Sequence, residues 1–130
     1  MERSVIEVAG ISAGIRRAGV PLSPAVRANG FVFVSGTPPF DLATGAFVKG
    51  DIARQTEQCL LCVQKVLEAA GSSLAKVCKV VIYASDAGHY ARINEVYARF
   101  FPEAPPARSF VPVAAWPFDF DIEIECVALA

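Results

Sequence analysis

The order of apolar and polar residues predicts strands in the first third of the chain. Residues 4–8 form a short apolar stretch, and two further apolar runs, 24–28 and 31–35, flank an Asn29-Gly30 pair. An Asn-Gly pair between two such runs is a strong signal for a two-residue hairpin turn. The Gly-Thr-Pro-Pro sequence at residues 36–39 is expected to break the sheet pattern.

The middle and the end of the chain predict two helices and three more strands. Asp51 can cap a helix that Gly71 ends, and a second helix is expected over residues 87–101, before Pro102. Strands are expected at residues 76–83, 107–113 and 121–128. The apolar faces are formed by Ile52, Thr56, Cys59, Val63, Val66 and Ala70 in the first helix, and by Tyr90, Ile93, Val96, Tyr97 and Phe100 in the second.

This order of elements predicts an α/β (α+β) fold in which two helices pack on one face of a mixed sheet. The 130 residues fit a single domain. Two helices cover only one face of such a sheet, and the strands are too apolar to leave the other face in water. Only 19% of the residues are charged, against about 25% in ordinary soluble domains. We therefore expect the chain to associate with itself through the uncovered face, although the pattern does not fix the number of subunits.

Charge and cysteine content argue against several classes of partner. The 12 basic and 13 acidic residues are spread along the chain and give a net charge of −1, so we expect no nucleic-acid partner. The longest uncharged run, residues 28–40, is too short to span a membrane and contains two prolines. The first residues have no apolar signal core, and four cysteines in a chain of this size do not suggest a disulfide framework. We expect a reduced, cytoplasmic protein.

Some residues with potential chemistry have simpler structural interpretations. Cys59 and Cys62 have the spacing of a zinc or redox pair, but both fall inside a predicted helix, which favours core packing. His89 is the only histidine and cannot form a multi-histidine metal site. We therefore expect no metal site. Three aromatic residues near the last strand are expected to pack or to line a pocket: Trp116, Phe118 and Phe120.

The strongest candidates for ligand binding are one arginine and one of two acids. Arg108 opens an otherwise apolar strand, where its head either lies in solvent or clamps a carboxylate through paired N–H donors. Glu123 and Glu125 lie on one side of the last strand, where they form either a solvated face or a site that positions a water. Spacing alone does not choose between the two acids.

Three segments together resemble a known family. They are Val-Phe-Val-Ser-Gly-Thr-Pro-Pro at residues 32–39, Pro-Ala-Arg-Ser at residues 106–109 and Ile-Glu-Ile-Glu at residues 122–125. The combination resembles the RidA/YjgF family of reactive intermediate deaminases, whose members carry a strand ending in Ser-Gly-x-x-Pro, a Pro-Ala-Arg-Ser signature and a terminal Ile-Glu-Ile-Glu strand. Further matches extend the resemblance over nearly the whole chain, from Val5 to Leu129.

The resemblance implies a chorismate-mutase-like fold and a homotrimer with a central barrel-like core. It places the active sites in clefts between subunits. It also implies hydrolysis of 2-imino or 2-enamino acids to 2-oxo acids and ammonia, without a cofactor, so the expected partner is a small carboxylate-bearing substrate. The alternative function is that of a non-catalytic protein of the same fold that binds a small carboxylate.

The resemblance also assigns roles to individual residues. Arg108 would bind the substrate carboxylate, and Glu123 would orient the attacking water. The backbone carbonyl of Phe110 would hold the same water. Ser35 and Gly36 would line the pocket.

Two positions depart from the family's pattern. Leu22 follows Pro21 where archetypal members have a tyrosine, and Phe110 stands where a cysteine is common. The missing hydroxyl removes a polar group from the expected pocket, and the larger Phe110 side chain would reshape it. The resemblance therefore predicts a retained carboxylate clamp and leaves the range of substrates open.

Overall fold

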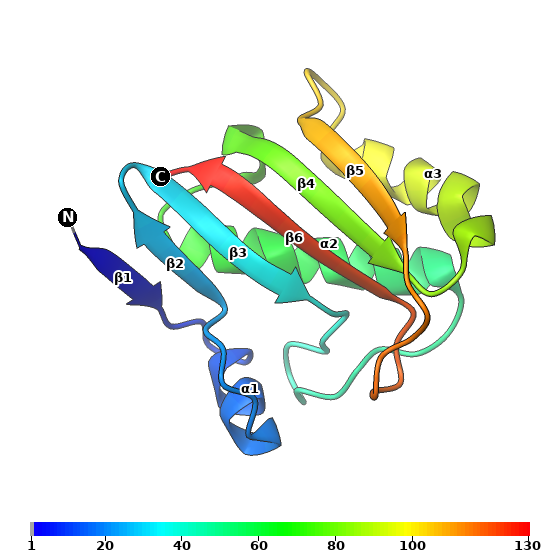
Figure 1. The fold of residues 1–130 in the computed structure, drawn as a ribbon, viewed down its shortest axis with the longest axis horizontal. Helices are drawn as coiled ribbons and strands as arrows, with labels where there is room; N and C mark the ends of the chain where they lie inside the picture. Colours follow the sequence, from blue (N-terminus) through cyan, green and yellow to red (C-terminus); the bar gives the residue numbers. More distant parts are fainter. Residues whose placement is uncertain (1) are drawn as a thin grey trace.

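The chain forms one six-stranded mixed β-sheet (Figure 1). The computed structural model describes residues 2–130, and the strands lie in the order β1-β2-β3-β6-β4-β5. Every neighbouring pair is antiparallel except β4 and β5, which are parallel. The strands are β1 (Arg3–Ile6), β2 (Ala25–Ala28), β3 (Phe31–Thr37), β4 (Val77–Ala84), β5 (Ala107–Pro112) and β6 (Ile122–Leu129). The predicted mixed sheet of an α/β (α+β) fold is confirmed.

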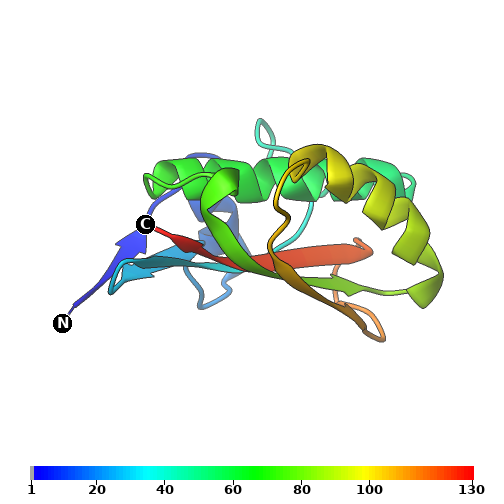
Figure 2. The ribbon, with the colours of Figure 1, turned by 90° about the horizontal axis from the view of Figure 1, so that it is seen from above.

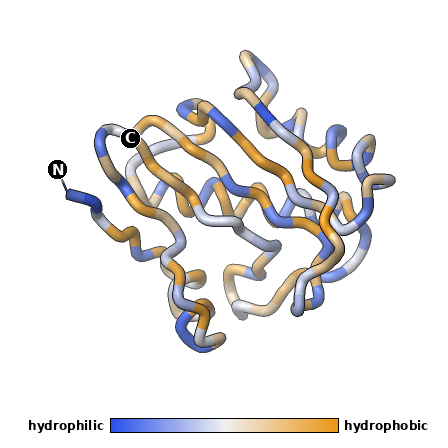
Figure 3. Tube along the Cα trace, in the orientation of Figure 1, coloured by the Kyte–Doolittle hydropathy of each residue, from blue (hydrophilic) through white to orange (hydrophobic). Residues whose placement is uncertain are grey.

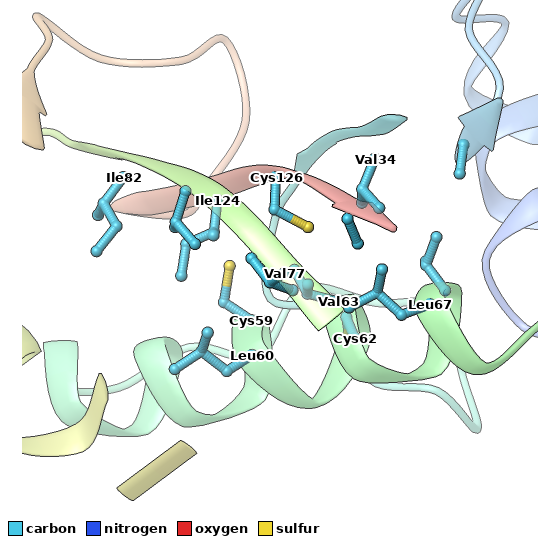
Figure 4. Close-up of a cluster of buried hydrophobic side chains, with 14 of the residues drawn as sticks. Val34, Cys59, Leu60, Cys62, Val63, Leu67, Val77, Ile82, Ile124 and Cys126 are labelled. Carbon is cyan, nitrogen blue, oxygen red and sulfur yellow. The ribbon is translucent and has the colours of Figure 1, made fainter. Parts of the chain in front are cut away.

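Two long helices, α2 (Ile52–Ala69) and α3 (Tyr90–Phe100), lie on one face of this sheet (Figure 2). Asp51 caps α2 as predicted, because its side chain accepts a hydrogen bond from the Arg54 backbone N–H at 2.9 Å. The predicted apolar face of α2 is buried, and Figure 4 shows Cys59 directed toward the strands. No helix within residues 2–130 is long and apolar enough to cross a membrane.

A third helix, α1 (Ser12–Ala18), was not predicted, so the expectation of only two helices was wrong. At seven residues it is too short to show a helical period in the sequence. Ile11 and Ile15 attach it to the core. Val8, expected to end the first strand, instead precedes α1, and its backbone N–H donates to Ser12 Oγ at 2.9 Å. This helix closes one end of the sheet, beside β2 (Figure 1).

The hairpin between β2 and β3 follows the prediction, but the end of β3 does not. Asn29 and Gly30 both have positive φ, 51° and 81°, as a type I′ turn requires. The expected break at residues 36–39 comes late, because β3 continues to Thr37. Its pairing with β6 shifts there: Val34 lies opposite Cys126, and Thr37 lies opposite Ile124. Three steps on β3 against two on β6 form a β-bulge, a feature that re-aims side chains beside functional sites.

The second face of the sheet carries apolar residues, and neither long helix covers this face (Figure 2). Phe33 alternates with the buried Val32 and Val34, so it points away from the helices, and 46% of its surface is exposed. Other large apolar side chains exposed on the strands are Val5, Phe31, Val111 and Leu129. Figure 3 shows hydrophobic residues along the central strands. The expected apolar, uncovered face is therefore present in the single chain.

Candidate functional site

A cavity of about 340 Å³ lies at the end of the sheet where β3 finishes. Its walls come from α1, the segment after α1, the end of β3, the start of β6 and nearby loops. A volume of this size is typical of small-molecule sites. Four of the residues predicted for the site line this cavity: Leu22, Ser35, Gly36 and Glu123.

A second hollow, of about 360 Å³, borders the same acid. It is lined by Glu123 and Gly36 together with Tyr83, Glu125 and Trp116, among others. Glu123 and Gly36 are therefore shared by the two spaces. A small molecule held beside Glu123 can extend into either one.

Ser35 fixes the wall of the cavity, since its hydroxyl is already engaged. Its Oγ donates to the Ser23 carbonyl oxygen at 2.6 Å, and its backbone N–H donates to the Pro24 carbonyl oxygen at 3.0 Å. These two bonds tie the segment that follows α1 to β3, and Leu22 belongs to that segment. Ser35 therefore acts as a positioning residue, because its hydroxyl proton is held by a backbone carbonyl oxygen and not by a base that would make it a nucleophile.

Gly36 is a glycine because Glu123 comes too close for any side chain. A Cβ built on Gly36 would overlap the Glu123 Oε1 atom and would lie 3.0 Å from Cδ. The β-bulge brings this glycine under the carboxylate. The Ser-Gly pair of the sequence thus has a physical reason, since the serine anchors the wall and the glycine leaves room for the acid.

Gly36→Ala is expected to lower the activity proposed below about 100-fold, because the added methyl group pushes the carboxylate away from its position. The measurement is kcat/KM of the variant against the wild type. The control is a double-mutant cycle, since Gly36→Ala should cost little more when Glu123→Gln is already present. Equal, additive losses in both backgrounds would contradict the link between these two residues.

The surroundings of the two acids on β6 favour Glu123 as the functional one. Burial raises the pKa of Glu123, the negative charge of Glu125 raises it further, and no hydrogen bond from the described residues offsets them. Glu125, by contrast, accepts a hydrogen bond from the Tyr83 hydroxyl, and this bond raises the pKa of Tyr83. A desolvated carboxylate without a partner is better suited to accept a proton from water.

Asp121, which precedes Glu123 by two residues, does not join Glu123 and Glu125 in the site. Its carboxylate accepts hydrogen bonds from Gln55 Nε2 and from Ser85 Oγ, each at 3.0 Å. Its backbone N–H also donates to Gln55 Oε1 at 2.8 Å. Asp121 therefore ties the start of β6 to α2, and its role is structural.

Removing the charge of Glu125 is expected to move the acid limb of the pH–rate profile to lower pH. In the reaction proposed below Glu123 acts in its ionised form, and its raised pKa means that activity should be lost early as the pH falls. Glu125→Gln removes the neighbouring negative charge and leaves an acceptor for the Tyr83 hydroxyl, so the pKa of Glu123 falls. The measurement is kcat/KM against pH. Glu95→Gln, on the exposed side of α3, is the control and should leave the limb in place.

Arg108 lies elsewhere, on the edge strand β5, against the aromatic residues of α3. Its Cζ lies 4.8 Å from the centre of the Tyr97 ring and 5.7 Å from that of Tyr90. Its Nη2 makes a long contact of 3.4 Å with the Tyr90 hydroxyl. No ion pair within residues 2–130 includes Arg108. The two rings hold the guanidinium by cation–π contact and leave most of its N–H donors available to a ligand.

Within one chain, the structure does not bring Arg108 and Glu123 together. Arg108 lies opposite the buried Val80 of β4, on the helix-covered face. Glu123 lies opposite Tyr83, in the alternate row that faces away from the helices. Phe110 stays with Arg108, because its ring packs edge-on against Tyr90 at 4.9 Å. The six predicted residues therefore form two groups, and β4 separates the strands that carry them.

The simpler interpretation of the two cysteines, core packing, is confirmed. The Cys59 and Cys62 thiols are buried and donate to the carbonyl oxygens of Thr37 and Phe40 at 2.7 Å and 3.1 Å. Burial raises the pKa of Cys62 to about 11 and that of Cys59 well above its usual value, so both are core thiols. His89 precedes α3 and is half-buried.

The aromatic residues before β6 have both roles that the sequence left open. Phe118 and Phe120 line the cavity, and Trp116 borders the second hollow. They also pack with one another and with Phe47, whose ring centre lies 5.0 Å from that of Phe120. One wall of the cavity is therefore a packed aromatic cluster.

Sequence reasoning missed the roles of Tyr90 and Tyr97. It assigned both to the apolar face of the second helix, yet Tyr90 is 47% exposed and both rings contact Arg108. Burial raises the pKa of Tyr97 to about 12, so its hydroxyl stays neutral. That hydroxyl and the Asn94 side-chain oxygen are buried without a hydrogen-bond partner among the described residues. The available signal was two tyrosines seven residues apart on one face of a helix that precedes the arginine.

Comparison with known proteins identifies relatives along most of the chain. A RutC family protein of Pyrococcus horikoshii is 48% identical over 108 residues, which are 83% of this chain and 86% of that protein. A chloroplastic protein of Arabidopsis thaliana named Reactive Intermediate Deaminase A is 42% identical over 108 residues, 83% of this chain and 58% of that protein. The crystal structure of Escherichia coli TdcF with bound serine has a TM-score of 0.87 at 33% identity and covers 98% of both chains.

A family model described as Endoribonuclease L-PSP matches residues 15–130. The match includes Ser35-Gly36, Arg108 and Glu123, which are the residues that carry the resemblance noted in the sequence. The names of the relatives differ in the activity that they imply. One relative is chloroplastic, so the cytoplasmic location of this chain stays a prediction. The chain belongs to the endoribonuclease L-PSP family, which is the RidA/YjgF family.

Proposed function

We propose that this protein is a hydrolytic deaminase of small 2-imino and 2-enamino acids, with each active site shared by two copies of the chain. The observation that carries the proposal is Glu123, a partly buried carboxylate at the junction of two hollows that has no hydrogen-bond partner among residues 2–130. The name of the Arabidopsis relative, Reactive Intermediate Deaminase A, supports the same reaction class.

The chemistry needs one water and one base. A protonated imine is already an electrophile, so its carbon accepts the oxygen of a water held by Glu123. As the C–O bond forms, Glu123 accepts a proton from the water and passes it to the nitrogen. The C–N bond then breaks while Glu123 takes the remaining hydroxyl proton, which gives the 2-oxo acid and ammonia. Glu123 passes that proton to the ammonia, which leaves as an ammonium ion. Glu123 also stabilises the cationic imine electrostatically.

The reaction also needs the substrate carboxylate to be held in place, and Arg108 is the group proposed to hold it. A guanidinium presents paired N–H donors that match both oxygens of a carboxylate. Tyr90 and Tyr97 hold the guanidinium in place, so less conformational freedom is lost when the substrate binds. Fixing the carboxylate fixes the imine carbon next to it, and positioning of this kind provides a large share of the rate enhancement. A role for the Phe110 carbonyl in holding the water is part of the same proposal.

Two copies are needed because Arg108 and Glu123 lie on opposite faces of one sheet. The exposed apolar face, which includes Phe33 and Leu129, gives the copies a surface to bury against one another. We propose a homotrimer with a central barrel-like core in which the Arg108 group of one copy meets the Glu123 group of the next. The bound serine in the TdcF structure is consistent with an amino-acid carboxylate as the group recognised.

The test is a coupled assay in which an amino-acid oxidase generates an imine in the presence of semicarbazide. Semicarbazide traps free imine as a semicarbazone that absorbs light, so an active deaminase lowers the rate of semicarbazone formation. We expect that decrease to depend on protein concentration, with release of ammonia and the 2-oxo acid. Unchanged semicarbazone formation across several imines would sink the deaminase.

The same experiment separates the alternatives. Binding of 2-oxo acids without any effect on semicarbazone formation would favour a non-catalytic carboxylate-binding protein. Cleavage of RNA by the wild type, retained in Arg108→Ala and accompanied by no imine hydrolysis, would favour the activity that the family's description names.

A further inference from the structure

The cavity beside Glu123 is lined mainly by apolar side chains, and we infer that it selects substrates with a large apolar side chain. This inference rests on the proposed function and names the substrate class of the same site. Ile15, Val20 and Leu22 form one wall, and Phe40, Phe47 and Phe118 form another. A cavity of about 340 Å³ has room for a branched aliphatic or aromatic side chain.

The polar groups that line the cavity do not make it hydrophilic. Ser35 Oγ donates to the Ser23 carbonyl oxygen, and Thr37 Oγ1 donates to the Ser35 carbonyl oxygen, so both hydroxyls are engaged within the protein. A substrate side chain in the cavity therefore meets hydrocarbon surface, with Glu123 at the inner end. Arg17 is exposed and lies against Gly45, at the rim.

Leu22 is central to this selection. It stands at a position where the resemblance expects a tyrosine, and it lines the cavity with an apolar side chain. Ser35 holds the Leu22 segment through its bonds to Ser23 and Pro24. The wall that departs from the family's pattern is thus a rigid part of the cavity, and the departure makes the cavity more apolar.

In the proposed reaction the two ends of the substrate meet different groups. The imine carbon lies beside Glu123, and its carboxylate binds Arg108 from the neighbouring copy. The substrate's side chain then extends from Glu123, which borders both spaces, into the apolar cavity. Small substrates leave this cavity unfilled and gain no binding free energy from it.

The test compares imines made from leucine and phenylalanine with the imine made from alanine. Each buried methylene strengthens binding by about fourfold. We therefore expect kcat/KM of the wild type to be at least about tenfold higher for the two large imines than for the small one. A preference for the imine of glutamate over that of leucine would point to Arg17 at the rim and would overturn the inference, as would equal values for large and small imines.

Gly14→Leu fills the cavity without touching the reacting groups. Gly14 lies on α1 and lines the cavity, and a Cβ built there has only Arg17 Nη2 nearby, at 3.9 Å. We expect the variant to lose about tenfold in kcat/KM for the leucine and phenylalanine imines and little for the alanine imine. Ala13→Leu is the matched control, since Ala13 is exposed on the same helix and does not line the cavity. Retention of the size preference in Gly14→Leu would overturn the inference.

A binding measurement separates this inference from the proposed reaction. Calorimetric titration with 4-methyl-2-oxopentanoate, phenylpyruvate and pyruvate reports side-chain selection without catalysis. Tighter binding of the two large oxo acids, lost in Gly14→Leu, supports the inference even if no imine is hydrolysed, in which case only the reaction fails. Equal affinities for all three acids overturn the inference while leaving any observed hydrolysis intact.

Discussion

Glu123→Gln is expected to lower kcat/KM for imine hydrolysis about 100-fold or more, the usual loss when a general base is removed. Glutamine keeps the size and a hydrogen-bond acceptor but cannot take a proton from water. The loss should appear in kcat more than in KM, because Arg108, the proposed carboxylate clamp, is unchanged. The measurement is the steady-state rate of 2-oxo acid formation from an imine generated in the assay.

The same substitution is expected to raise thermal stability at neutral pH. Burial and Glu125 raise the folded-state pKa of Glu123 above its unfolded value. A carboxyl group with a raised pKa favours the folded state only while protonated, below its unfolded pKa, and that contribution is lost as the pH rises through the folded pKa. At neutral pH the ionised group therefore costs stability, and the neutral amide removes that cost.

Thermal unfolding followed by circular dichroism measures this effect. The gain in Tm of Glu123→Gln over the wild type should be largest at neutral pH and should shrink as the pH falls toward the usual range for a glutamate. An inactive variant that is also less stable at neutral pH would indicate that Glu123 has a structural role. A fully active variant would remove Glu123 from the reaction.

Local chemistry explains which parts of the fold the sequence predicts. Asn29-Gly30 predicts its hairpin because few other dipeptides adopt two positive φ values easily. Asp51 predicts the start of α2 because its carboxylate satisfies a free backbone N–H. The short helix α1 has neither a period nor a side-chain cap, and its place depends on Ile11 and Ile15 reaching a core built from later residues. The bulge at the end of β3 depends equally on its partner strand.

The candidate site was predictable only as far as it lies within one chain. Leu22, Ser35, Gly36 and Glu123 come together because β3 pairs with β6 and Ser35 ties down the segment before β2. The alternation of a strand does not reveal that Arg108 belongs to the opposite face, because β5 is joined to β4 by a long connection through α3. That separation makes a second copy of the chain part of the proposed site, a requirement that no spacing in the sequence expresses.

Mixing two inactive variants is expected to restore activity. Arg108→Ala should lower kcat/KM about 1,000-fold, since it removes the group that fixes the substrate carboxylate. Arg108→Lys should recover little of this loss, because an ammonium cannot hold both carboxylate oxygens in a fixed plane. If the site takes Arg108 from one copy and Glu123 from the next, hybrids of Arg108→Ala and Glu123→Gln contain some sites with both groups intact. In a random equal mixture about a quarter of the sites are intact.

Co-refolding the two variants from denaturant, followed by the imine assay, measures this recovery. The matched control mixes Arg108→Ala with the double variant Arg108→Ala/Glu123→Gln, which contains no intact arginine and should stay inactive. Native mass spectrometry of the same samples reports whether hybrids formed and how many chains each contains. Hybrids that form without recovering activity would contradict a shared site, and a single-chain mass for the wild type would contradict the assembly itself. Recovery near the expected quarter would assign the two groups, on opposite faces of one sheet, to the same reaction.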